Sequence, residues 1–310
     1  DGVCPLSATD LELWIRVKAG VESCEDGDAM LPAKIVNILR ESDSDDIAME
    51  LSNERCIVKL RNGKFDMATL NPAEFPGFDT VEFDKAIELS ADMFKSMVDK
   101  TSFAAGSSGT GKVDTGVTQG VCIELADGNL TFTGANSKSL ATISHDAPYS
   151  EKSIKVASKK FLDLVSASAE DSVMINLFVD NLIAAKTGDV EIVSKVIDGR
   201  FPQWRMLIPK ESTFTAIVNV GSLLSAVKQT AIMTDDMANR ITFAFSEGKL
   251  ALSATESPLG KSAIEIDVEC GGKLEMIFNP VIWIAMLSKL DPASSLTFSA
   301  TVDRKPTILT

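Results

Sequence analysis

Apolar residues recur along the chain with two periods, one typical of strands and one typical of helices. Residues 6–18 alternate between apolar and polar side chains, which predicts a half-buried strand. Its apolar positions are Leu11, Leu13, Ile15 and Val17. Residues 31–41 carry apolar side chains at helical spacing, with Pro32 in the first turn, which predicts a helix. The core face of this helix is expected to hold Ile35, Val36, Ile38 and Leu39.

The same reading predicts further helices and many short strands. The helices are expected at 90–104, 157–167, 219–233 and 279–290. The strands are expected at 47–52, 55–60, 64–70, 81–88, 117–125, 129–135, 138–145, 172–178, 181–187, 190–196, 213–218, 240–246, 249–255, 262–269, 295–302 and 306–310. Asn62-Gly63 and Asp127-Gly128-Asn129 predict hairpin turns, and Ser90 is a plausible helix cap. Because the strand connections are short, we expect antiparallel sheets with helices on one face, in the α+β class.

Several patterns repeat at similar long offsets. Phe75-Pro76 is followed 126 residues later by Phe201-Pro202, and the apolar pattern of 35–39 recurs at 161–165 with the same offset. Residues 278–287 can be laid over 156–165 with an offset of 122, and the apolar residues of 93–98 are matched 130 residues later. These repeats predict three similar domains. Their expected bounds are 1–78, 79–209 and 210–310.

Composition narrows the class of protein. The 310 residues, 45% apolar and 24% charged, can form two or three soluble domains, and no apolar run is long enough to span a membrane. The net charge of −14 disfavours a protein that reads a DNA groove, but it allows one that encircles DNA. Five scattered cysteines without zinc spacing indicate reduced thiols in the cytoplasm, and the single histidine, His145, has no partner for a metal site. We therefore expect no metal and no cofactor.

The sequence gives no positive case for catalysis. Gly106–Lys112 has the spacing of a phosphate-binding loop, but Val113 stands where magnesium needs a hydroxyl, and the loop follows a helix where the motif needs a strand. A Gly/Ser-rich linker is the competing interpretation. No serine lies in a nucleophile elbow, and the pairs Asp45-Asp46 and Asp235-Asp236 are expected to be solvated.

The segment Asp198–Pro209 carries the most specific pattern, Asp-Gly-Arg-Phe-Pro-Gln-Trp-Arg-Met-Leu-Ile-Pro. Together with the three repeats, it makes the chain resemble the bacterial sliding clamp family, the beta subunit of DNA polymerase III. Supporting matches fall in the family's order over nearly the whole chain. They are Thr9-Asp10-Leu11-Glu12, Leu31-Pro32-Ala33, Asn71–Pro76, Ile277-Phe278-Asn279 and Lys305–Leu309.

The chain departs from the family pattern in three places. From the family pattern, we expect that the strand and helix that precede the Thr9–Glu12 strand in clamps are missing here, as is the last strand with its Met-Pro-type tail. Where the family usually has Thr-Asp-Gly-His-Arg-Leu-Ala, this chain has Ala135–Ala141, so the basic pair is reduced to Lys138.

The resemblance implies clamp-type domains, each with two helices packed on antiparallel sheets, in a head-to-tail homodimeric ring around duplex DNA. Such a ring is a processivity factor that holds DNA independently of sequence and has no active site. It would work in the cytoplasm at the nucleoid. Helix residues implied to face the DNA are Lys34, Arg40, Lys95, Lys100, Lys159, Lys160, Lys228 and Lys289. The alternative is a clamp-related scaffold that does not encircle DNA.

The resemblance also implies two protein interfaces. The ring would close where Phe65 and Met67 of one copy meet Ile232 and Met233 of the other, unless these four are ordinary core residues. The replicative polymerase and the clamp loader would dock short apolar peptides between the second and third domains, unless Met206 and Leu207 simply seal that junction. Residues mapped to this peptide site are Thr118, Ala135, Ser137, Lys138, Leu140, Pro202, Met206, Leu207, Asn279 and Ile282.

Overall fold

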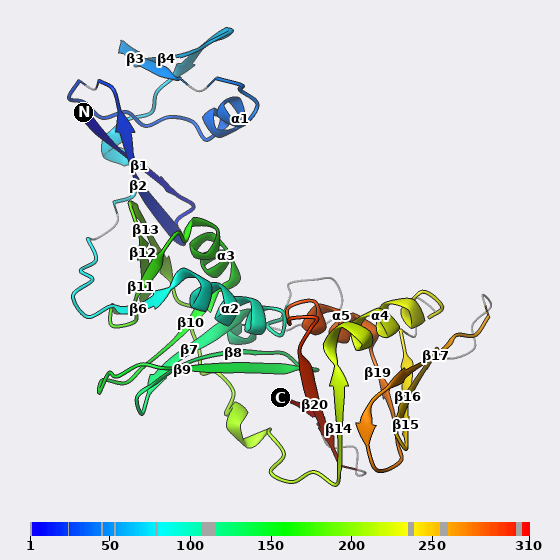
Figure 1. Ribbon diagram of the computed structural model, residues 1–310. Helices are drawn as coiled ribbons and strands as arrows, with labels where there is room; N and C mark the ends of the chain where they lie inside the picture. The colour runs from blue at the N-terminus through cyan, green and yellow to red at the C-terminus, as the bar shows by residue number, and fades with distance from the viewer. Residues whose placement is uncertain are drawn as a thin grey trace. The chain divides into compact units, whose positions relative to one another are not determined.

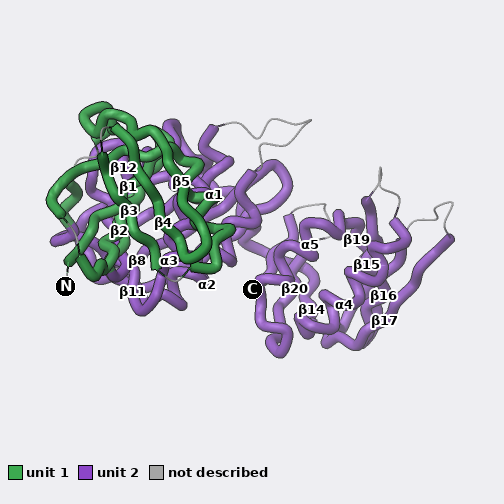
Figure 2. The backbone as a smooth tube through the Cα atoms, turned by 90° about the horizontal axis from the view of Figure 1, so that it is seen from above, with its two compact units in different colours: residues 1–82, 189–192 green, residues 83–188, 193–310 purple. Residues whose placement is uncertain are grey.

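The computed structural model describes residues 2–23, 25–44, 46–52, 54–77, 80–106, 116–234, 239–254, 260–301 and 306–310. Several residues singled out above lie outside this set. They are Cys24, Asp45, residues 107–113 of the Gly-rich loop, Asp235, Asp236 and Lys305. The chain divides into two compact units, residues 1–82 with 189–192, and residues 83–188 with 193–310 (Figure 2). The three-domain division therefore stays a prediction.

Unit 1 opens with a β-hairpin where one strand was predicted. Strand β1 (Gly2–Thr9) pairs antiparallel with β2 (Leu13–Val21), and the prediction of one strand over 6–18 is wrong. The turn between them is formed by Asp10, whose carboxylate accepts hydrogen bonds from the backbone N–H groups of Glu12 and Leu13. Leu11 adopts a φ of +75° there and is exposed, so its apolar side chain continues the alternation without belonging to a strand.

The rest of unit 1 holds one helix and a three-stranded sheet in the order β3-β4-β5. The elements are α1 (Lys34–Arg40), β3 (Ala48–Ser52), β4 (Arg55–Leu60), β5 (Gly63–Ala68) and the 3-10 helix η1 (Pro72–Glu74). Leu60 pairs with Gly63, so the hairpin loop is residues 61–62, one residue earlier than predicted. Helix α1 is shorter than predicted and buries no residue, and Val36 is exposed rather than on a core face. Its N-cap, Ala33, provides no side-chain hydrogen bond, which limits the helix at that end.

The first half of unit 2 contains two helices and two sheets. Its elements are β6 (Ile87–Ser90), α2 (Ala91–Ser102), η2 (Gly116–Gln119), β7 (Gly120–Ala126), β8 (Asn129–Ala135), β9 (Leu140–Asp146), β10 (Ser153–Ser158), α3 (Lys159–Ser168), β11 (Ser172–Asn176), β12 (Leu182–Thr187) and β13 (Val190–Lys195), of which residues 190–192 belong to unit 1. One sheet has the order β10-β7-β8-β9, and in the other β13, β12, β11 and β6 are neighbours. The predicted strand 81–88 is reduced to the four residues of β6.

The second half of unit 2 repeats this plan. Its elements are η3 (Trp204–Met206), β14 (Phe214–Asn219), α4 (Val220–Ala231), β15 (Ile241–Ser246), β16 (Lys249–Ala254), β17 (Ala263–Asp267), β18 (Glu269–Cys270), β19 (Leu274–Phe278), α5 (Pro280–Leu287), β20 (Ser295–Ala300) and β21 (Ile308–Leu309). The strand predicted at 262–269 is split into β17 and β18, and β19 was not predicted. The sheets have the orders β17-β16-β15-β19 and β18-β14-β20-β21.

Most of the strand order is the same in the two halves, although β13 and β18 have no counterpart. The sheet β10-β7-β8-β9 matches β19-β15-β16-β17, and the pair β6–β11 matches β14–β20. In each half, one helix follows each of two strands, and the two helices pack side by side, α2 with α3 and α4 with α5 (Figure 1). All the strand pairs whose register is described are antiparallel. The predicted α+β class with repeated helix-and-sheet copies is confirmed.

The helix layer of the first half packs tightly on its sheet because β8 carries a glycine at the contact. A Cβ atom on Gly134 would lie 2.0 Å from the carbonyl oxygen of Thr101 in α2. Phe94 of α2 meets Phe132 of β8 edge to face, with ring centroids 6.1 Å apart. The predicted turn at Asp127 and Gly128 is also present, with both residues at positive φ.

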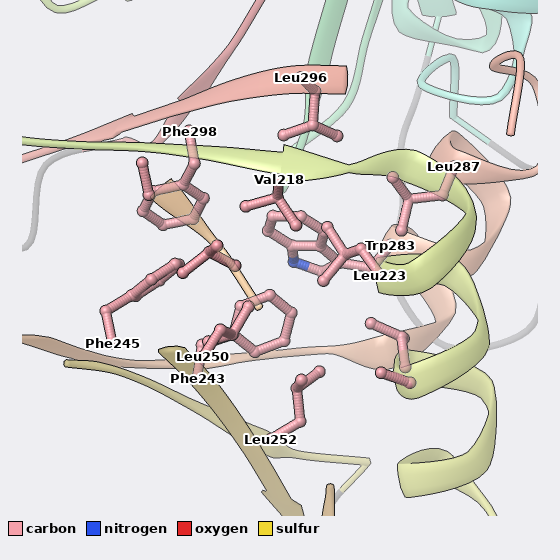
Figure 3. Packing of buried hydrophobic residues seen from close by; sticks show 14 of the residues in the cluster. Val218, Leu223, Phe243, Phe245, Leu250, Leu252, Trp283, Leu287, Leu296 and Phe298 are labelled. Carbon is pink, nitrogen blue, oxygen red and sulfur yellow. The ribbon is translucent and has the colours of Figure 1, made fainter. Parts of the chain in front are cut away.

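An aromatic cluster fills the core of the second half (Figure 3). Phe298 of β20 lies at its centre, with its ring centroid 4.8 Å from Phe245 and 6.2 Å from Trp283. Phe214 and Phe278 complete the surroundings of this ring. The cluster joins both sheets to α5, so it holds the layers of this half together.

None of the helices in the described ranges is both long enough and apolar enough to cross a membrane. Within the same ranges, no three His, Cys, Asp or Glu side chains gather in a way that could hold a metal ion.

We expect Phe298→Ala to lower the free energy of unfolding by about 3–5 kcal/mol, because it removes a fully buried ring and leaves a cavity. Urea titration followed by circular dichroism measures this change. Val281→Ala, at an exposed position of α5, is the matched control and should change stability by less than about 0.5 kcal/mol. Equal effects of the two substitutions would contradict the central place given to Phe298.

Candidate functional site

The segment 197–209 leaves β13 under tight local constraints. The Ile197 N–H donates to the carbonyl oxygen of Val156 at 2.9 Å, which ties the start of the segment to β10. Gly199 then adopts a φ of +126°, and a Cβ atom there would lie 2.8 Å from Cγ1 of Val117. Only glycine satisfies both conditions, so the Asp-Gly pair of the sequence pattern has a structural cause.

The middle of the segment is fixed by Trp204 and Arg205. Trp204 is buried, and the guanidinium of Arg205 lies 4.3 Å from the centre of its ring. The same guanidinium donates from Nη1 to Oε2 of Glu124 in β7 at 2.8 Å. The short helix η3 adds a hydrogen bond from the Leu207 N–H to the Trp204 carbonyl oxygen at 2.9 Å. Sequence reasoning found the segment but missed Glu124, which lies 81 residues away in the chain.

Trp204 and Arg205 form the anchor of the segment. The three apolar residues that follow this anchor are exposed to solvent. Met206 is 78% exposed, Leu207 is 59% exposed and Ile208 is 37% exposed. A run of exposed apolar side chains on a fixed backbone is typical of a surface that binds another protein. We call residues 206–208 the apolar run.

Four of the residues mapped to the peptide site lie on the β8–β9 hairpin. Ala135 pairs with Leu140 across it, and the side-chain oxygen of Asn136 accepts hydrogen bonds from the backbone N–H groups of Lys138 and Ser139. Ser137 and Lys138 are exposed, Leu140 is half-buried, and Ala135 is buried. The hairpin therefore offers Leu140 and the two polar residues to a ligand, while Ala135 offers little surface.

The remaining mapped residues lie on three other elements. Thr118 belongs to η2 and is half-buried, and Pro202 is exposed just before η3. Asn279 is the N-cap of α5, with its side-chain oxygen accepting from the Val281 N–H at 2.9 Å, and Ile282 is half-buried one turn into that helix. The convergence of all these groups on one peptide stays a prediction.

Beneath the anchor lies a buried thiol. Burial raises the pKa of Cys122 to about 12, the Glu124 carboxylate adds to the rise, and Arg205 opposes it. At neutral pH this cysteine is therefore a protonated, unreactive core residue. Among the described residues, free thiols are found at Cys4, Cys56, Cys122 and Cys270.

The predicted DNA-facing residues fall into two groups. Lys95 donates to the Ala169 carbonyl oxygen at 2.8 Å, Lys159 donates to that of Ala105 at 3.1 Å, and Lys289 pairs with Asp99 at 2.6 Å. Burial lowers the pKa of Lys159 below its usual range. Lys95 and Lys159 are half-buried, whereas the exposed members are Lys34, Arg40, Lys100, Lys160, Lys228 and Lys289.

The helices of unit 2 differ in charge from the chain as a whole. Helices α2 to α5 carry five lysines and three aspartates, whereas the whole chain has a net charge of −14. The helix layer is thus mildly basic in an acidic protein. This distribution fits sequence-independent contact with phosphates better than the net charge alone suggests.

The residues predicted to close a ring lie at the edges of their sheets or helices. Phe65, 40% exposed, and half-buried Met67 are on β5, an edge strand of its sheet. Ile232 is 74% exposed immediately after α4, and Met233 packs near Gly260. Of the four, Phe65 and Ile232 have the exposure that a contact with another copy requires.

Two family models match this chain. The model of the central domain of the DNA polymerase III beta subunit matches residues 88–203, and that of its C-terminal domain matches residues 205–310.

Curated relatives with the name beta sliding clamp are also similar. The protein of Chlamydia trachomatis serovar D is 27% identical over 289 residues, which covers 91% of this chain and 68% of the relative. That of Synechococcus elongatus is 25% identical over 286 residues, covering 88% of this chain and 75% of the relative.

Solved structures share the fold. The DNA polymerase III subunit beta of Pseudomonas aeruginosa superposes with a TM-score of 0.87 at 22% identity, covering 98% of this chain and 85% of that one. A putative DNA polymerase III beta subunit of Eubacterium rectale gives a TM-score of 0.88 at 20% identity, covering 100% and 85%.

Proposed function

The chain belongs to the family of the DNA polymerase III beta subunit, and we propose that it acts as a sliding clamp, a processivity factor that encircles duplex DNA. In this role two copies form a head-to-tail ring, and the helices of the repeated copies face the DNA. Retention then comes from topology and from weak contacts to phosphates. The family is not enzymatic, which confirms the prediction that the chain is not an enzyme.

The observation that carries this proposal is the charge distribution across the fold. A mildly basic helix layer in an acidic chain lets DNA lie against the helices and keeps the remaining surface from binding nucleic acid. A clamp-related scaffold that does not encircle DNA would need no such separation of charge.

We expect the protein to stay on nicked circular duplex DNA and to leave when the circle is cut, because a ring is held by topology. Gel filtration of the complexes before and after restriction cleavage measures this retention. In the variant Lys100→Ala with Lys228→Ala, the slope of log affinity against log salt should fall by about 2, since two phosphate contacts are lost. Equal retention on linear and circular DNA would favour the scaffold.

The ring is proposed to close through β5 of one copy and the end of α4 of the other. We expect Ile232→Ala with Met233→Ala to give a folded monomer, because the exposed Ile232 and its neighbour then lose their apolar contact. Analytical ultracentrifugation gives the mass, and circular dichroism checks the fold. Leu6→Ala, at an exposed apolar position of β1, is the control and should leave the mass unchanged. A dimeric or unfolded double variant would rule this interface out.

The apolar run is proposed to bind short peptides of the polymerase and the clamp loader, together with Leu140, Pro202, Asn279 and Ile282. Trp204 and Arg205 fix the backbone before binding, so little conformational entropy is lost when a peptide docks. Because Met206, Leu207 and Ile208 are all apolar, apolar peptides should bind with little dependence on acidic residues.

We expect a peptide of the type Gln-Leu-x-Leu-Phe to bind with a Kd on the order of micromolar, and Leu207→Lys to abolish binding without a large change in Tm. Isothermal titration calorimetry measures the affinity. Val36→Lys, at a similarly exposed apolar position in unit 1, should bind the peptide like the parent. If Leu207→Lys binds as tightly as Val36→Lys, the apolar run is not the docking surface.

A further inference from the structure

The two matching sheets of unit 2 each have an outer face that points away from the helices. In β10-β7-β8-β9, Cys122 on this face pairs with Val156 and Thr133. In β17-β16-β15-β19, Thr242 has the equivalent position and pairs with Ile277 and Ser253. The register therefore makes Ile277 the counterpart of Val156.

The chain itself covers the part of the first sheet's outer face around Cys122, whereas Ile154 on the same face is 62% exposed. Cys122, Thr133 and Val156 are buried, although they point away from α2. Ile197 hydrogen-bonds to Val156, and Arg205 pairs with Glu124 on this same face. The segment 197–205, with its Trp-Arg pair, is thus seated on the sheet.

The outer face of the second sheet lacks such a cover among the described residues. Ile277 is 61% exposed, whereas its counterpart Val156 is 4% exposed. The position of Glu124 is taken by Ala244, but Glu275 lies directly opposite Ala244 on β19. The second sheet therefore also carries a carboxylate on its outer face. It lies on the neighbouring strand, about 5 Å from the position that corresponds to Glu124.

The charge of this outer face is acidic. Within the strands, this face carries Glu265, Asp267 and Glu275 together with Lys249, which pairs with the first two and leaves Glu275. A cationic ligand is favoured there, and the exposed Ile277 offers an apolar contact beside Glu275.

We propose that the outer face of β17-β16-β15-β19 binds an extended peptide of a partner protein in which an aromatic residue is followed by arginine. In this proposal the aromatic side chain lies on Ile277, and the guanidinium pairs with Glu275 as Arg205 pairs with Glu124 on the first sheet. This site is separate from the apolar run and does not depend on ring formation or on DNA.

The chain supplies its own probe, since residues 197–209 already occupy the equivalent face. A fluorescently labelled synthetic peptide of this sequence, titrated with the full chain, reports binding by anisotropy. We expect Ile277→Lys to weaken binding at least about tenfold, because it places a cation in the apolar contact and beside the arginine. Val281→Lys, equally exposed on α5, is the matched control and should change the affinity less than about twofold.

A charge exchange tests the second contact. Glu275→Lys should weaken binding of the parent peptide, and a peptide carrying Arg205→Glu should bind Glu275→Lys better than it binds the parent chain. Recovery by this exchange supports a direct ion pair, which a general loss of structure does not produce.

Three outcomes would overturn the proposal. The first is no binding of the probe at millimolar concentration. The second is equal binding by the Ile277→Lys and Val281→Lys variants, which would place the probe elsewhere, for example in exchange with the segment on the first sheet. The third is concentration-dependent association of the peptide-free chain that Ile277→Lys abolishes, which would assign the face to a second copy.

Discussion

The architecture of unit 2 depends on one kind of junction, which occurs four times: a strand runs directly into a helix, and a side chain at the junction caps the helix. Ser90, Ser158, Asn219 and Asn279 each end a strand or follow it directly, and each accepts a hydrogen bond from a backbone N–H of the first helical turn. A helix end left without such a partner loses about 1 kcal/mol. With four junctions of one kind, each helix follows its strand directly, and the helices pack in pairs, α2 with α3 and α4 with α5. The mildly basic helix layer follows from that arrangement.

Much of this fold was readable from the sequence because local signals and tertiary packing agree. Ser90 and the Asp127-Gly128 turn have the structures that their residue types favour. The predictions of secondary structure are wrong where one local pattern is compatible with two structures. Leu11 continues a strand-like alternation but lies in a turn, and the alternation of β19 runs into a predicted helix, where it was overlooked. The candidate site was found through its Pro-bracketed segment, but its anchor was not. No spacing rule connects Glu124 with Arg205, so only the folded chain shows that contact.

Units 1 and 2 differ in how fully their apolar residues are buried. In unit 2 the helices bury a row of side chains, such as Phe94, Met97 and Val98 in α2. In unit 1, helix α1 buries none, and Met49 and Leu51 of β3 are exposed on the same face of the sheet as buried Val58 and Cys56. The described residues therefore cover only part of the apolar face of this sheet. The periodicity of residues 35–39 predicted a core that the structure forms only in part, because periodicity indicates which face is apolar and not how much of it is covered.

The apolar run stays exposed because of the interactions that hold the residues before it, and the free energies of these interactions can be compared. An exposed ion pair such as Arg205 with Glu124 contributes only about 0–1 kcal/mol, so the burial of Trp204 does most to hold the segment. Burying a leucine or methionine side chain is worth about 1.5–3 kcal/mol, and three such side chains remain in water directly after that anchor. A flexible segment would fold these side chains back onto the nearest apolar surface. Gly199, Trp204 and Arg205 prevent this, so a partner that covered residues 206–208 would gain the burial free energy that folding leaves unused.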